Sequence, residues 1–103
     1  MKEYTNQLKE LKASVPEQYS EENLQNLEKI VTQYHQIMLS IAEMEDEDNK
    51  TQYHLERIDA LEDYLRNAKY GTSERQRASS FAQAKEILFE GIQALLNIIG
   101  ETN

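Results

Sequence analysis

Apolar residues recur at alternating intervals of three and four along almost the whole chain, and this rhythm limits the fold most. An α-helix has about 3.6 residues per turn, so the spacing gathers apolar side chains into one stripe. Only one Pro and three Gly interrupt the 103 residues. The stripe positions of the successive segments are Met1, Tyr4, Leu8, Leu11 and Val15; Leu24, Leu27, Val31, Tyr34, Met38 and Ile41; Leu55, Ile58, Leu61, Leu65 and Ala68; Phe81, Ala84, Leu88, Ile92, Leu95 and Ile99. We therefore expect an all-α protein.

Local signals divide this pattern into four helices. Pro16 ends the first helix, and Ser20 is a good N-cap for the second, followed by two acids that suit its dipole. Gly71 follows the third at a position that is often left-handed. Thr72 or Ser73 is expected to cap the fourth, and Ser73 opens a capping-box sequence. Gly100 is expected to end the last helix in the same way. The predicted helices cover residues 2–14, 20–47, 51–70 and 73–99.

Four helices of these lengths predict an antiparallel bundle of three long helices plus a short N-terminal helix, in one domain over residues 1–103. The least certain boundary is the acidic stretch at residues 43–49, which carries five carboxylates. Carboxylates oppose the dipole at a helix C-terminus, so a turn is expected there. Nothing in the stretch forbids a helix, however, and one continuous rod through it is the competing topology.

Composition and charge exclude several classes of protein. The 19 Asp and Glu outweigh the 11 Lys and Arg, giving a net charge of −8, which argues against binding a phosphate backbone. The absence of Cys rules out a disulfide framework and thiolate metal sites. The most apolar stretch, residues 87–99, is too short to span a bilayer, and the N-terminus lacks an apolar signal segment. We expect a cytoplasmic protein that acts on other proteins.

Motifs that carry catalytic chemistry are missing. The sequence has no Gly-rich phosphate loop and no nucleophile motif. The acidic stretch fails as a calcium loop, because Thr51 stands where Gly is needed and Arg57 where the bidentate Glu is needed. His35 and His54 are expected at the core edge, and no Glu-x-x-His pair supplies a di-iron site. We therefore predict a protein that is not an enzyme and holds no metal or cofactor.

The last predicted helix is unusually apolar. Its stripe is flanked by further apolar residues on both sides, so the apolar arc covers roughly 200°, about twice what a bundle-surface helix needs. A helix of this kind must be covered on three sides. It is therefore the central helix of the fold, or part of it is covered by a second copy or another protein. Gly91 lies within the arc and would permit a close helix crossing.

This surplus leads to the main functional hypothesis, a protein-binding module of the adaptor, chaperone or inhibitor type. The predicted partner-binding residues are Phe89, Ile92, Leu96, Ile98 and Ile99. The alternative is a homodimer or assembly component with the last helix on the symmetry axis. A nucleic-acid mimic ranks third, because the acids cluster and are not spaced like phosphates.

Opposite charges concentrate at two of the predicted turns. The basic cluster near the third turn consists of Arg66, Lys69, Arg75 and Arg77, and the acidic cluster near the second consists of Glu45, Asp46, Glu47 and Asp48. The favoured interpretation is solubility together with dipole compensation at the end of the third helix. The sharper interpretation is electrostatic docking of an acidic partner or head-to-tail pairing of copies.

Overall fold

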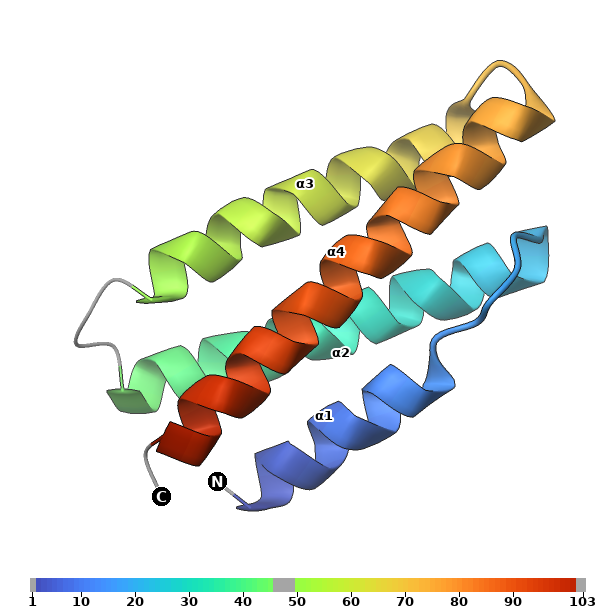
Figure 1. The fold of residues 1–103 in the computed structure, drawn as a ribbon. Helices are drawn as coiled ribbons and strands as arrows, with labels where there is room; N and C mark the ends of the chain where they lie inside the picture. The colour runs from blue at the N-terminus through green and yellow to red at the C-terminus, as the bar shows by residue number, and fades with distance from the viewer. Residues whose placement is uncertain (1, 46–49, 102–103) are drawn as a thin grey trace.

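A computed structural model describes residues 2–45 and 50–101, and these form four helices (Figure 1). They are α1 (Lys2–Ser14), α2 (Glu21–Glu45), α3 (Lys50–Tyr70) and α4 (Glu74–Glu101). The predicted all-α bundle with a short N-terminal helix is confirmed. Because α2 and α3 run side by side in opposite directions, the continuous rod is excluded. The centre of the predicted acidic turn, 46–49, lies outside the described residues.

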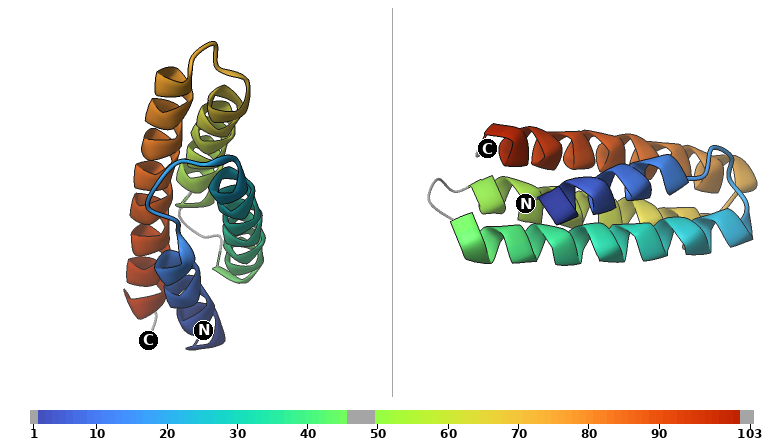
Figure 2. Two further views of the ribbon diagram at one scale, coloured as in Figure 1. Left: turned by 90° about the vertical axis from the view of Figure 1, so that its right-hand side faces the viewer. Right: turned by 90° about the horizontal axis from the view of Figure 1, so that it is seen from below.

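The helices alternate in direction, and α2 and α4 each contact all three other helices. α1 and α3 run one way, while α2 and α4 run the other way (Figure 1). α4 packs most extensively on α3 and also contacts α1 and α2, whereas α1 and α3 do not pack together in the described part. Figure 2 shows α1 lying along the space between α2 and α4. α4 therefore makes the most extensive contacts with the rest of the bundle.

The predicted apolar stripes meet in one core. Each of the four helices contributes side chains to it. The largest fully buried side chains are Tyr34, Phe81, Leu8, Leu27, Met38, Leu61, Leu88, Ile92, Leu95 and Ile99. No helix in the described ranges is long and apolar enough to cross a membrane.

Both serine caps form as predicted. The Ser20 hydroxyl oxygen accepts the Asn23 amide hydrogen at 3.0 Å, and the Ser73 hydroxyl oxygen accepts that of Gln76 at 3.1 Å. The side chain of Gln76 reaches back as a capping box requires, but it accepts from the backbone amide of Thr72 at 3.1 Å instead of from Ser73.

Gly71 directly follows the last residue of α3, as predicted, but the predicted left-handed conformation at Gly71 and the predicted helix end at Gly100 were wrong. Gly71 does not take a left-handed backbone conformation. A Cβ at Gly71 would lie 2.7 Å from the Asn67 carbonyl oxygen and 3.0 Å from Cγ of Arg77, so close approach is what requires glycine there. Gly100 lies inside α4, which continues through Glu101. Glycine costs a helix only about 1 kcal/mol, so the residue did not have to end it.

The connection between α1 and α2 is held by contacts with α3 and α4. The ring of Tyr19 packs edge-on against Phe81 with centroids 5.6 Å apart, and its hydroxyl donates to the Ala68 carbonyl at 3.4 Å. The ammonium group of Lys85 donates to the Glu17 carbonyl at 2.7 Å. Residues 17–19 are therefore held by α3 and α4 independently of α1.

Candidate functional site

The centre of the apolar arc of α4 lies inside the protein. Ile92 and Ile99, both predicted to bind a partner, have exposed fractions of 0% and 1%. They are core residues in this structure, because the other three helices cover the middle of the arc. Burial therefore removes both residues from the predicted partner-binding surface.

The flank of α4 remains accessible. Phe89 and Leu96 are half-buried on one side of α4 and pack against the core without joining it fully. Ile98 is also half-buried, but at about 100° per residue it lies on the opposite side of the helix, and it does not line the groove described next. Phe89 and Leu96 line an open groove of about 630 Å³ between α1 and α4. The groove is completed by Thr5, Lys9, Lys12, Ala13, Gln93 and Asn97. It thus combines two apolar side chains with lysines and amides, and no carboxylate lines it.

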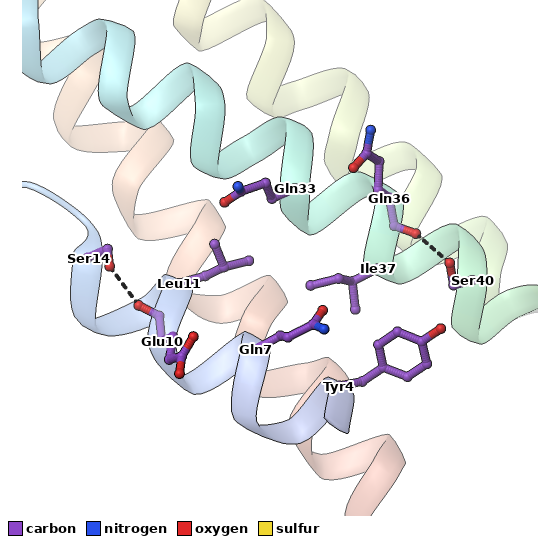
Figure 3. A pocket seen from close by; sticks show the side chains of 9 residues that line it. All are labelled: Tyr4, Gln7, Glu10, Leu11, Ser14, Gln33, Gln36, Ile37 and Ser40. Carbon is purple, nitrogen blue, oxygen red and sulfur yellow. Dashed lines mark hydrogen bonds between the residues drawn. The ribbon is translucent and has the colours of Figure 1, made fainter. Parts of the chain in front are cut away.

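A second groove, of about 560 Å³, runs along the opposite side of α1, between α1 and α2 (Figure 3). Its lining consists of Tyr4, Gln7, Glu10, Leu11, Ser14, Gln33, Gln36, Ile37 and Ser40. Leu11 and Ile37 are almost wholly buried, and Glu10 is the one charged residue among the lining residues. The surfaces on both sides of α1 are therefore rich in uncharged amides, although 29% of the whole chain is charged.

α1 packs between these grooves mainly through its apolar stripe. Its buried apolar residues are Leu8 and Leu11, followed by Val15 just beyond its end. The ammonium group of Lys12 donates to the side-chain carbonyl of Gln93 at 3.1 Å across the α1–α4 groove. The periodicity predicted the apolar stripe of α1, but it did not show that both sides of the helix would stay open.

A buried polar cluster joins α2, α3 and α4 at Gly91. A Cβ on this residue would lie 2.8 Å from Cδ of Arg57 and 2.9 Å from Cζ of Tyr34, and closer still to the Tyr34 hydroxyl. The side chain of Arg57 is only 9% exposed, and it donates to the Ile87 carbonyl at 3.2 Å and pairs with Glu90 at 3.5 Å. The predicted close helix crossing at Gly91 is thus not a backbone contact, because the groups nearest to this residue are side-chain atoms of Tyr34 and Arg57.

Tyr34 gives the bundle a dependence on alkaline pH. Burial raises the pKa of Tyr34 to about 12, while the positive charge of Arg57 acts to lower that pKa. The stabilisation is complete below the ordinary tyrosine pKa of about 10 and is lost as the pH rises towards 12, because the unfolded chain ionises first.

Between pH 9 and 11 the wild type should therefore lose about 1.4 kcal/mol more free energy of unfolding than Tyr34→Phe. Urea denaturation of both proteins at each pH measures this difference. Other groups titrate equally in the two proteins and cancel. Parallel losses in the two proteins would show that Tyr34 ionises as readily in the folded state as in the unfolded state.

Most side chains of the predicted basic cluster contact groups of α3 or of the turn that follows it. The Arg77 guanidinium donates to the Gly71 carbonyl at 2.8 Å, and Arg66 pairs with Asp63 at 3.0 Å. Lys69 lies 5.6 Å from the ring centre of Tyr70, and Arg75 is exposed. Arg77 thus binds a carbonyl just beyond α3, while dipole compensation by Arg66 and Lys69 at the end of α3 stays a prediction.

The docking interpretation of the two charge clusters stays a prediction. Asp46, Glu47 and Asp48 lie outside the described residues, and Glu45 is described only as the last residue of α2. His35 is half-buried beside the α2–α3 groove, whereas the side chain of His54 lies outside the described part. Within the described part of the chain, no three His, Cys, Asp or Glu residues gather to hold a metal ion.

No protein-family model, no curated protein and no solved structure matches this chain.

Proposed function

We propose that this chain is a small protein-binding module of the adaptor, chaperone or inhibitor type, whose partner engages the outer flank of α4. The observation that supports this proposal is the pair Phe89 and Leu96, half-exposed in an open groove beside the shortest helix. Such an open groove, lined by both apolar and polar side chains, suits recognition of another protein surface.

The most exposed large apolar side chains of the described surface lie away from this groove. In the described ranges these are Leu39, with an exposed fraction of 42%, and Tyr70, with one of 73%. These two residues lie on α2 and at the end of α3, and neither of them lines the α1–α4 groove. The flank of α4 is therefore the better candidate for a specific interface.

A dimer with α4 at its symmetry axis has less support from this geometry. That hypothesis arose because the wide apolar arc needed a cover, and the cover is supplied largely by α1, α2 and α3 of the same chain. A second copy is therefore one outcome of the partner search below, and the bundle does not need it to bury α4.

Affinity capture from the cells that produce this protein, read out by mass spectrometry, tests the proposal. The amount of partner captured by the Phe89→Glu/Leu96→Glu variant should be lower than that captured by the wild type by about tenfold or more. The reason is that a charge buried in an interface without a counter-charge is strongly unfavourable. Leu39→Glu is the matched control, since it places the same charge on an exposed apolar position elsewhere, and it should capture normally.

Circular dichroism on both variants separates binding from folding. Retained helicity with lost capture supports the proposed surface. Normal capture by the Phe89→Glu/Leu96→Glu variant contradicts it, and so does a loss of helicity, since the two residues would then serve only the core.

A further inference from the structure

α1 occupies the valley between α2 and α4 without filling it. An open groove runs along each of its sides, one lined by Gln33, Gln36 and Ile37 of α2 and the other by residues of α4 that include Phe89 and Leu96. A bundle helix packed on both sides to interior density leaves no such spaces. The helix is also the shortest, at 13 residues, and it does not pack on α3. It is therefore the most weakly held element of the described fold.

The contacts of the segment after α1 would allow this helix to separate from the bundle while the segment itself stays in place. Glu17 and Tyr19 are fixed to α4 and α3 by the Lys85 and Ala68 hydrogen bonds, at 2.7 and 3.4 Å, and by the contact with Phe81. Pro16 lies directly before these anchors and has no amide hydrogen to give to α1. A rotation of the backbone at residues 15–16 would release α1 while residues 17–20 and the cap of α2 stay in place.

The surface of α2 and α4 that faces α1 also has few charged groups that could make it specific for α1. The amides of Gln33 and Gln36 line the groove on one side of α1, and those of Gln93 and Asn97 line the groove on the other side. α1 is held there by its apolar stripe and by the hydrogen bond from Lys12 to Gln93. Because these lining residues of α2 and α4 are uncharged, a helix that binds here needs the same apolar stripe and one hydrogen-bond donor.

We infer that α1 is a displaceable lid, and that the valley between α2 and α4 is the seat for an amphipathic helix of the binding partner. This inference rests on the proposed function and names its partner class. The partner helix has about three turns, with apolar residues spaced like Leu8, Leu11 and Val15, and a lysine placed like Lys12 to meet Gln93. In the place of α1, the partner helix would contact more of α4 than the present groove leaves accessible.

Hydrogen exchange on the unmodified chain tests whether the lid opens. The amides of α1 should be at least about 100-fold less protected than those in the middle of α4, and should exchange at denaturant concentrations that leave α4 protected. Exchange of α1 together with α4, in one global unfolding event, would overturn the inference.

Binding to the seat is measured with a fluorescein-labelled peptide of residues 2–15, the one helix already seen to fit. The Leu8→Glu/Leu11→Glu variant weakens the hold of the attached α1, so it should bind this peptide at least about tenfold more tightly than the wild type. Equal affinities, or loss of α2–α4 helicity in the variant, would overturn the inference.

The chain has no Cys, so a closed form is made by joining thiols in Lys12→Cys/Gln93→Cys with a short bis-maleimide. This form should bind the peptide at least about tenfold more weakly than the same variant before cross-linking. If the cross-linked form captures the cellular partner normally, the lid inference fails and the proposed function stands. If the Phe89→Glu/Leu96→Glu variant captures normally, the proposed function fails as well.

Discussion

Replacing Ile92 with alanine should lower the free energy of unfolding by about 2–5 kcal/mol, because the side chain is fully buried where α4 meets the rest of the bundle. Urea denaturation followed by circular dichroism measures the loss. The removed methyl and methylene groups leave a cavity that the tightly packed surroundings fill only in part.

Leu96→Ala is the matched control for this experiment. Leu96 lies one helical turn away on the half-buried flank of α4, so its truncation should cost less than half as much. Equal losses at both positions, or a negligible loss at Ile92, would contradict the division of α4 into a buried centre and an accessible flank.

Replacing Gly91 with alanine should destabilise the protein by about 1–3 kcal/mol, although alanine is the better helix former. The added methyl group would overlap the Tyr34 hydroxyl and lie 2.8 Å from Cδ of Arg57. The Tyr34 ring is fully buried, so it cannot move aside without disturbing its neighbours. The measurement is again urea denaturation, with the exposed α4 position Gln83→Ala as a control that should change stability by less than about 0.5 kcal/mol.

A double-mutant cycle identifies the cause of the Gly91 effect. Tyr34→Phe removes the hydroxyl that the new methyl would meet first, so Gly91→Ala should cost less in that background than in the wild type. Costs that simply add would show that the hydroxyl is not the obstacle. A stabilising effect of Gly91→Ala alone would show that α4 has room for a side chain at this crossing.

The existence and type of every helix could be predicted from local signals. The three–four spacing of residues such as Leu24, Leu27 and Val31 defines one face of a helix whatever that helix packs against. Ser20 and Ser73 act on amide hydrogens three residues away, so their caps also follow from the sequence alone. Gly91 could be flagged because a glycine within an apolar arc implies close approach.

The division of α4 into core and flank could not be predicted in the same way. Periodicity shows that Ile92 and Phe89 both belong to the apolar arc, but the arrangement of the other helices decides which of them is covered. For the same reason, the grooves beside α1 were missed, since each is formed by two helices that are separate in the sequence. The uncharged amides at Gln33, Gln36 and Gln93 are the sequence signal that could have identified these surfaces in a strongly charged chain.

Hydrogen exchange of this chain with and without its captured partner tests the proposed function most directly. The expected result is increased protection on α4 around residues 89–96, together with lower protection along α1, because the partner takes the place of that helix. Increased protection confined to α3 or to the exposed side of α2, with α4 unchanged, would contradict the proposal that the flank of α4 is the binding surface.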